Sequence, residues 1–362
     1  MKQRLQKTVL LAAAAFAIVS APALAQTATS AADYQAVIEA SKSENGLLVY
    51  SNLPVSTWTE FRKLLSQTYP WVKMETTDMG AEMWERYFAE SGAGTRTADL
   101  ISTVAPDRYA NFIDRGEVNP YVSREIDSLP KWSRPEPGLY TISASPAILV
   151  FNRAQVKNPP KSIRDIAELA KADPKGMNGK ISTYDATTNS FGTAMFATWL
   201  LGEGNSWDIL APIGAATRPE QGAGVQREKV MTGEYNVAFF FNSVSLVPLE
   251  RPEVKKLVGW DYLADGTPVT LQNIVVTKAA KSPNTAKIVL DLMLSREGQI
   301  ALAKVGLTPY RDDVPQDGLP YPTLKTAAQK IGEKNLIYSN YDRSKLAEWP
   351  AIVAKFATLF KK

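Results

Sequence analysis

Hydrophobic and polar positions in the first third of the chain alternate between the spacings of strands and of helices. Short apolar or alternating runs predict strands at 47–51, 71–77 and 99–103. Apolar residues at helical spacing predict a helix after each strand, around 61–68, 84–88 and 106–115. Thr57-Trp58-Thr59-Glu60 predicts a capping box at the start of the first helix. This β-α-β-α-β-α order requires right-handed crossovers, so it predicts a parallel sheet covered by helices.

A second series of the same kind begins near residue 144. Strands are predicted at 148–152, 180–184, 237–241 and 273–277. Helices are predicted after the N-cap Ser162, at 193–201 and around 288–293, and a proline-rich stretch at 309–322 leads into closing helices. The fold class predicted from the residues is therefore α/β, with two α/β lobes.

The amino terminus has the three zones of an export signal. Lys2, Arg4 and Lys7 precede an apolar run at 9–19, and Ala23-Leu24-Ala25 provides a small-x-small cleavage pattern. The run is shorter than the roughly 20 residues that span a bilayer, and no cysteine follows it for lipid attachment. We predict a signal peptide at 1–25, a mature start near Gln26 and a periplasmic protein. An uncleaved anchor fits these zones less well.

Composition limits the chemistry that the chain can perform. It contains no cysteine and no histidine, which excludes disulfides, Cys/His zinc sites, thiol nucleophiles and imidazole bases. Residues 1–25 hold three basic residues and no acidic one, so the remainder carries 38 basic against 37 acidic side chains. Such a balanced, interspersed charge does not predict a basic patch that would bind nucleic acid or a membrane surface.

Motifs for nucleotide binding or catalysis are absent or coincidental. The glycines at 92 and 94, and at 202 and 204, lack the remaining glycines of a dinucleotide fingerprint. Ser128-Leu129-Pro130-Lys131 matches S-x-x-K, but no K-T-G accompanies it. We therefore predict no enzyme, no catalytic residue, no metal site and no cofactor. Two distant carboxylates acting as acid and base remain an alternative, which would make the protein an exported hydrolase or lyase.

Small polar residues gather where predicted strands pass into helices. Ligands of open α/β sheets sit beyond the carboxyl ends of strands, where free backbone amides are exposed. Each such residue can be an ordinary helix cap, but several of them in two lobes favour a shared polar site. The candidate ligand-binding residues are Ser51, Asn52, Gly80, Ser102, Thr103, Thr188, Asn189, Ser190, Thr193, Phe241 and Asn242. Arginines that could pair with a ligand anion are Arg62, Arg153, Arg227 and Arg311, and position alone does not choose among them.

The order of short motifs resembles the periplasmic solute-binding proteins of ABC importers, in the group that binds ferric iron, sugar phosphates, phosphonates, polyamines or thiamine. The resemblance covers most of the chain after residue 26. It rests on Leu48–Ser51, Ala98–Leu100, Gly116–Tyr121, Ile148–Asn152, Pro159–Ser162, Gly179–Ile181, Asn189–Gly192, Ala279–Asn284, Leu294–Gln299 and Gly306–Arg311. It implies the type II periplasmic binding protein fold, in which two doubly wound α/β lobes are joined by crossing hinge strands. It also implies closure on a solute and delivery to a permease with a cytoplasmic ATPase.

The chain departs from the ferric members of this group at three loops. Those members place His or Tyr in the first loop, an acidic residue after the third strand and a tyrosine pair after the strand ending near Phe241. The matching stretches here are Asn52–Pro54, Thr103–Ala105 and Phe241–Val244. Because a hard trivalent cation needs several anionic oxygens, these neutral side chains favour a small organic anion, phosphorylated or carboxylated.

These expectations define one hypothesis and its rivals. We predict a monomeric binding protein that captures a small anionic solute between lobes and does not insert into the membrane. The predicted lobes are 26–143 with about 273–310, and 144–272, while the lobe of 311–362 stays open. The alternatives are a ferric-iron binding protein of the same group, the exported hydrolase or lyase, and a sensor that serves no importer.

Overall fold

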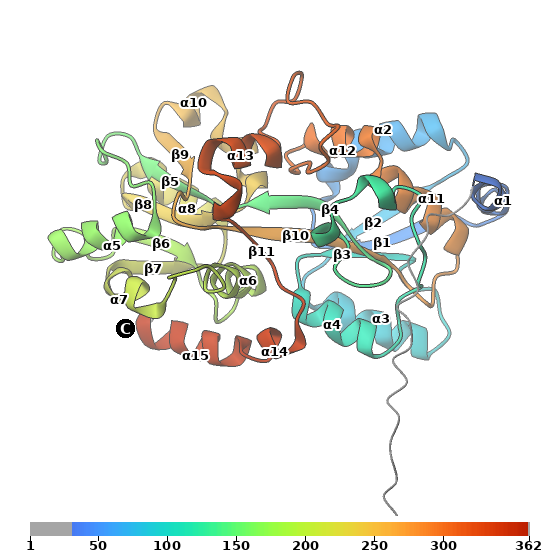
Figure 1. Cartoon of the computed structure of the whole chain (residues 1–362), viewed down its shortest axis with the longest axis horizontal. Coiled ribbons are helices and arrows are strands. Elements are labelled where there is room, and N and C mark those ends of the chain that lie inside the picture. The colour runs from blue at the N-terminus through green and yellow to red at the C-terminus, as the bar shows by residue number, and fades with distance from the viewer. Residues whose placement is uncertain (1–30, 361–362) are drawn as a thin grey trace, which may run out of the picture.

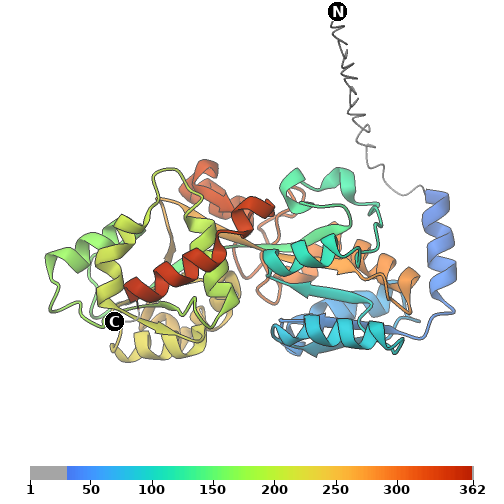
Figure 2. The same ribbon diagram turned by 90° about the horizontal axis from the view of Figure 1, so that it is seen from below.

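The computed structural model describes residues 31–360, so the predicted signal peptide at 1–25 lies outside the described residues. Two sheets form two lobes that lie side by side along the longest axis of the molecule (Figures 1 and 2). We call the lobe that contains β1 the first lobe and the lobe that contains β5 the second lobe. Within residues 31–360, no helix is long and apolar enough to cross a membrane.

The sheet of the first lobe has a parallel centre and antiparallel additions. Strands β1 (Leu47–Ser51), β2 (Met74–Asp78) and β3 (Leu100–Thr103) are parallel, as the sequence predicts. The strand order is β11-β10-β3-β1-β2, with β4 also paired to β10. Helices α2 and α12 lie on one face of this sheet, and α3 and α4 lie on the other (Figure 1). The helices of this lobe are α1 (Ala31–Ser41), α2 (Thr59–Thr68), α3 (Glu82–Gly92), α4 (Pro106–Asp114), α11 (Pro283–Leu294) and α12 (Arg296–Ala303).

The second lobe contains a five-stranded sheet in the order β7-β6-β8-β5-β9. Its strands are β5 (Ile148–Asn152), β6 (Ile181–Tyr184), β7 (Thr217–Glu220), β8 (Val237–Phe241) and β9 (Val258–Tyr262). β6 is parallel to β7 and β8, whereas β5 is antiparallel to β8 and β9. The helices of this lobe are α5 (Ile163–Ala172), α6 (Ser190–Trp199), α7 (Trp207–Ala216), α8 (Ala223–Thr232), α9 (Leu246–Leu249) and α10 (Pro252–Lys255).

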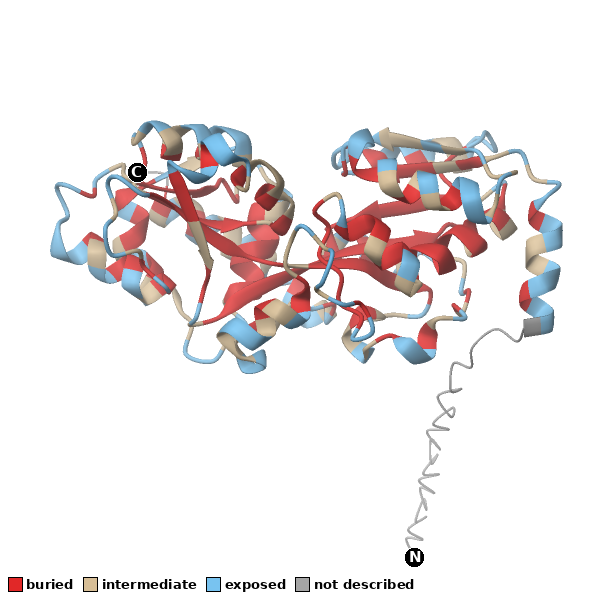
Figure 3. Ribbon diagram, turned by 90° about the horizontal axis from the view of Figure 1, so that it is seen from above, coloured by how far each residue is buried: buried red, intermediate tan, exposed pale blue. Residues whose placement is uncertain are grey.

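Two long strands connect the lobes. β4 (Leu139–Pro146) runs directly into β5, and β10 (Thr267–Val276) follows β9. They pair antiparallel from Val269 opposite Pro146 to Val275 opposite Leu139, with a register shift between Gln272 and Asn273. Both strands are almost wholly buried, and they are the continuous red ribbon between the lobes in Figure 3. The sequence predicted only the last part of β10 and missed β4. The lobe boundaries near 143 and 273 stay predictions.

The carboxyl-terminal segment contacts both lobes. After α13 (Leu324–Ile331), β11 (Leu336–Tyr338) pairs with the beginning of β10. In α14 (Arg343–Leu346), the guanidinium of Arg343 lies 2.9 Å from Asp114 and 2.7 Å from Glu136 of the first lobe. In α15 (Trp349–Phe360), Phe356 and Phe360 belong to the hydrophobic core of the second lobe. This segment therefore ties the two lobes together away from the crossing strands.

Several sequence predictions differ from the structure in detail. The predicted capping box is wrong: the N-cap of α2 is Trp58, it has no side-chain cap bond, and a 3-10 turn (Val55–Trp58) leads into the helix. The carboxylate of Glu60 instead contacts Lys63 at 2.5 Å. The predicted strands at 71–77 and 273–277 begin at Met74 and Thr267, and the predicted helix at 193–201 begins at Ser190. The short strands β7, β9 and β11 were missed because they exist only through pairing with neighbours.

A buried carboxylate joins α11 to the loop that follows α4. Asp291 accepts hydrogen bonds from Tyr121 Oη at 2.6 Å and from Ser123 Oγ at 2.5 Å. Burial raises the pKa of Asp291 to about 7, with Glu125 adding to the rise and Arg124 opposing it. A carboxyl group whose pKa is raised in the folded state stabilises the fold below its unfolded pKa and loses that contribution as pH rises.

We expect Asp291→Asn to flatten the dependence of the unfolding free energy on pH between about 4 and 7. In the parent protein, ionisation of Asp291 should lower the free energy of unfolding as pH rises through that window. The loss is about 1.4 kcal/mol for each unit by which folding raises the pKa of Asp291. Urea unfolding at pH 4.5, 6 and 8 measures the difference. Asp208→Asn, at an exposed position of α7, is the charge-matched control. Parallel pH profiles for the parent and Asp291→Asn would contradict the assignment.

Candidate functional site

A cleft of about 360 Å³ lies between the lobes. The first lobe contributes the loop after β1 with Asn52, Leu53 and Pro54, together with Val104 and Leu307. The second lobe contributes Phe191, Ala223, Arg227, Pro248 and the segment 242–245. The crossing strands form its floor through Ser143, Ser145, Thr270 and Gln272. The cleft therefore draws on both lobes and on the strands that connect them.

The floor follows from the alternation of side chains along the two crossing strands. Residues two apart in a strand point to the same face. Thr270 is paired with Ser145 and Gln272 with Ser143, so these four polar residues form two cross-strand pairs on one face. The intervening pair, Leu271 with Ala144, is fully or almost fully buried on the other face. Pairing of β4 with β10 thus creates a polar floor beneath the cleft.

On the first-lobe side, a short amide network holds the loop after β1. Gln272 Nε2 donates to Asn52 Oδ1 at 2.9 Å and to Ser102 Oγ at 3.1 Å. Ser51 Oγ accepts from the backbone amide of Leu53 at 3.1 Å. Ser51 and Ser102 are themselves completely buried. These serines fix the loop, and Asn52 is the member of the group that reaches the cleft.

On the second-lobe side, Asn242 follows β8 and caps the next turn. Its Oδ1 accepts from the amide of Ser245 at 3.2 Å and from the hydroxyl of Ser245 at 2.8 Å. The hydroxyl of Ser145 donates to Ser243 Oγ at 2.8 Å and accepts from the amide of Ser243 at 2.7 Å. The contacts between Ser145 and Ser243 therefore connect the crossing strand β4 to the second-lobe wall of the cleft.

Arg227 is the one charged side chain among the described residues that line this cleft. It lies half-buried on α8, and no described residue forms a hydrogen bond or ion pair with it. Lys229, on the same helix, differs: its ammonium lies 2.9 Å from Glu220 and 3.2 Å from Tyr235 Oη. Burial, together with the hydrogen bond to Glu220, raises the pKa of Tyr235 to about 12. The charge of Lys229 is therefore satisfied internally, whereas that of Arg227 is offered to the cleft.

The other candidate arginines have structural partners. Arg311 is almost fully buried and pairs with Glu125 at 2.9 Å and Asp313 at 2.7 Å. Arg153 Nε donates to the carbonyl of Lys255 at 2.9 Å. Arg62 donates to Thr76 Oγ1 at 2.7 Å. Position in the sequence could not separate these roles.

One polar atom of the floor lacks a partner. Thr270 is 1% exposed, and no described residue forms a hydrogen bond with its hydroxyl. Ser143, in the neighbouring pair, donates to the carbonyl of Thr308 at 3.1 Å and accepts from its amide at 2.8 Å. An unpaired buried hydroxyl costs free energy unless something satisfies it, so the one in Thr270 marks a point where a bound molecule can form a hydrogen bond.

The structure places the predicted site residues in three groups. Asn52 and Asn242 line the cleft, and Ser51, Ser102, Thr103 and Phe241 are buried at the strand ends next to them. Thr188, Asn189, Ser190 and Thr193 surround the start of α6, where Asn189 Oδ1 caps Gly192 at 3.1 Å and Thr193 binds the carbonyl of Ala186 at 2.8 Å. Gly80 is exposed, and its amide donates to Glu82 at 2.8 Å. Neither the four residues around the start of α6 nor Gly80 lines the cleft. As solute contacts, all eleven stay predictions.

Sequence reasoning missed most of the floor and of the apolar wall. The segments Ser143-Ala144-Ser145 and Thr270-Leu271-Gln272 alternate polar and apolar residues, which is the signal that could have identified a strand with one polar face. Phe191, directly after Ser190, lines the cleft although only its neighbours were selected.

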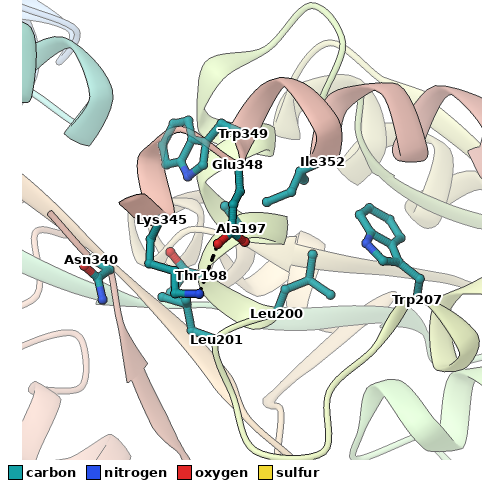
Figure 4. A pocket seen from close by; sticks show the side chains of 10 residues that line it. All are labelled: Ala197, Thr198, Leu200, Leu201, Trp207, Asn340, Lys345, Glu348, Trp349 and Ile352. Carbon is teal, nitrogen blue, oxygen red and sulfur yellow. Dashed lines mark hydrogen bonds and ion pairs between the residues drawn. The ribbon is translucent and has the colours of Figure 1, made fainter. Parts of the chain in front are cut away.

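A second pocket, of about 180 Å³, lies between α6 and the carboxyl-terminal helices (Figure 4). Its charged lining residues are Lys345 and Glu348, which form an ion pair at 3.1 Å. They neutralise each other, so this pocket offers no free charge to a ligand. Throughout residues 31–360, no group of three or more acidic side chains is placed to hold a metal ion.

The model of the bacterial extracellular solute-binding protein family matches residues 62–308, and the chain belongs to this family. In fold, it is similar to the substrate binding protein of an ABC transporter from Agrobacterium tumefaciens, at a TM-score of 0.74 and 19% identity, covering 88% of this chain and 96% of that one. Iron-bound HitA from Pseudomonas aeruginosa has a TM-score of 0.69 and 17% identity, covering 87% and 99%.

A third similar structure is the periplasmic binding protein AfuA from Actinobacillus pleuropneumoniae with fructose-6-phosphate bound. Its TM-score is 0.66 at 18% identity, covering 87% of this chain and 98% of that one. No curated protein matches the chain in sequence. The predicted family and the two-lobe α/β fold of periplasmic binding proteins are confirmed. These identities are too low to transfer a ligand.

We expect Thr270→Val to stabilise the ligand-free protein by about 1 kcal/mol, because valine has the same shape and removes a buried hydroxyl that lacks a partner. Ser143→Ala is the matched comparison in the adjacent pair. It should destabilise by about 1 kcal/mol, since it leaves the amide of Thr308 without its acceptor. Chemical unfolding without ligand measures both changes. Equal losses of stability for the two variants would show that the Thr270 hydroxyl has a partner.

Proposed function

We propose that this protein is the periplasmic substrate-binding component of an ABC importer and that it captures a small organic anion between its lobes. Arg227 is the observation that carries the proposal. A guanidinium that has no partner within residues 31–360, placed in a cleft between two lobes, is suited to pair with a carboxylate or phosphate oxygen. The chain is a binding protein without catalytic activity in this proposal, and it acts as a monomer.

Hinge closure gives the mechanism of capture. A solute held by Arg227 on the second lobe and by Asn52 on the first makes more contacts when the lobes approach each other. The ligand therefore favours the closed state by the difference in its binding free energy between the two states. A permease that recognises the closed form would receive the loaded protein and exclude the empty one.

The lining of the cleft disfavours two of the three alternatives, the ferric-iron protein and the exported enzyme. Among residues 31–360, no carboxylate and no tyrosine lines it, so the described lining lacks the anionic oxygens that ferric iron requires. It also lacks the pair of carboxylates that an exported hydrolase or lyase of the kind considered above would need. Similarity in fold to iron-bound HitA therefore does not extend to an iron site in this cleft.

Arg227→Gln should lower the affinity for the solute by about tenfold to a hundredfold, because a charge-assisted hydrogen bond contributes about 1.5–3 kcal/mol. The ligand is first identified by mass spectrometry of the compound that co-purifies with the protein, and titration calorimetry then compares variants. Unfolding of the empty protein should be unchanged, since Arg227 forms no hydrogen bond or ion pair with any residue that the structure describes. Arg108→Gln, which removes an equal charge from α4, is the control for net charge.

The proposal fails if Arg227→Gln binds the co-purified solute as tightly as the parent protein does. It also fails if the solute recovered after prolonged incubation has been converted into another compound, because that outcome identifies an enzyme.

A further inference from the structure

The charge, the free hydrogen-bonding groups and the apolar side chains of the cleft together indicate which kind of small anion it binds. This inference rests on the proposed function, since it concerns the same cleft. We propose that the solute is a monocarboxylate with an apolar body, whose carboxylate pairs with Arg227 and whose body lies against Leu53, Pro54, Val104 and Phe191.

The first step is the balance of charge. Arg227 supplies one positive charge, and the other described lining residues are neutral. A carboxylate carries one negative charge, and its two oxygens match the two parallel donors of a guanidinium. A phosphate monoester carries roughly 1.5 to 2 negative charges near neutral pH and presents three acceptor oxygens. In a cleft with a single cation, the second phosphate charge would be desolvated without a partner.

The second step is the supply of hydrogen bonds. Ser143 is engaged with the backbone of Thr308, and Ser145 with Ser243, through both donor and acceptor contacts. The amide nitrogen of Gln272 is shared between Asn52 and Ser102. Most of the polar floor is thus committed to the protein itself. A polyol such as a sugar would bury several hydroxyl groups against this floor, where few groups remain to receive them.

The unpaired hydroxyl of Thr270 fits a solute with few polar atoms. It is buried in the floor and has no partner among the described residues. It can donate to one carboxylate oxygen or to a single polar substituent of the solute. One guanidinium and one free hydroxyl are enough for a carboxylate.

The third step is the apolar surface on both sides of the cleft. Leu53, Pro54 and Val104 come from the first lobe, and Phe191 comes from the start of α6 in the second. Phe191 is held edge-on to the ring of Tyr184, with centroids 5.1 Å apart, so its orientation is fixed before a ligand arrives. Closure on an apolar group would remove these side chains from water, which is a favourable contribution that a hydrophilic solute could not provide.

Titration calorimetry of the full-length protein after removal of co-purified ligand tests the class. The panel contains straight-chain monocarboxylates of four to eight carbons, phenylacetate and benzoate, with fructose 6-phosphate, inorganic phosphate and citrate as competitors of other classes. We expect at least one monocarboxylate to bind with a Kd below 1 mM. The corresponding uncharged amide should bind at least tenfold more weakly, and none of the competitors should exceed the best monocarboxylate.

Two variants separate the apolar wall from the charge. Phe191→Ala should weaken the best monocarboxylate at least fivefold and leave the ratio of acid to amide affinity unchanged. Arg227→Gln should reduce that ratio towards one. Val225→Ala, which truncates an exposed residue of α8 outside the lining, is the control and should bind like the parent protein.

The outcomes distinguish this inference from the proposed function. If fructose 6-phosphate, phosphate or citrate binds through Arg227 and no monocarboxylate does, the monocarboxylate class is wrong and the anion-binding function stands. If only uncharged solutes bind, or binding is indifferent to Arg227→Gln, both proposals are wrong. A best monocarboxylate that is unaffected by Phe191→Ala overturns the assignment of the apolar wall.

Discussion

The pairing of β4 with β10 is the constraint on which the rest of this molecule depends. These strands are almost wholly buried, they carry the chain between the lobes, and they supply the floor of the cleft. Their register sets Ser145 opposite Thr270 and Ser143 opposite Gln272, so a slip of one strand by one residue would turn its two polar side chains away from the cleft. Asn273, the next residue of β10, points to the opposite face, and the register shift brings Thr141 opposite it, so that its amide donates to Thr141 Oγ1 at 3.1 Å. The same pair of strands therefore both connects the lobes and sets the geometry of the cleft floor.

Around this ribbon, polar side chains divide into those that maintain the protein and those that are left for a solute. The serines of the cleft bind one another, the backbone or Asn242, and Arg311 and Lys229 are neutralised by acidic neighbours. Arg227 and the hydroxyl of Thr270 remain without such partners among the described residues. This division matters because Arg227 is the one charged side chain in the described lining, so its charge dominates the electrostatics of the cleft. The ion pair of Arg343 with Asp114 of the first lobe, with α15 packed in the second, connects the same two lobes outside this cleft.

Local patterns predicted most of the regular structure because burial and local preference agree there. The runs at 47–51, 148–152 and 237–241 became β1, β5 and β8 with the predicted bounds, and Ser162 caps α5 through the amide of Asp165. Prediction failed where long-range contacts decide: β9 and β11 are edge additions, and Thr57 is part of a 3-10 turn rather than a cap. Strand β4 was missed because Leu139–Pro146 mixes small polar and apolar residues, which is typical of a strand with one polar face but weak as an isolated signal.

From the sequence alone came the family resemblance, the absence of thiol and imidazole chemistry, and the neutral character of the loops after β1 and β8. Two cleft residues, Asn52 and Asn242, could be selected because the carboxyl ends of strands are where α/β folds bind ligands. The tertiary structure alone decided which of four arginines is free, since partners such as Glu125 of Arg311 and Lys255 of Arg153 are distant along the chain. It also decided that Ser143, Thr270 and Gln272 share one surface, because Ser143 lies more than a hundred residues from the other two and only the register of β4 against β10 brings them together.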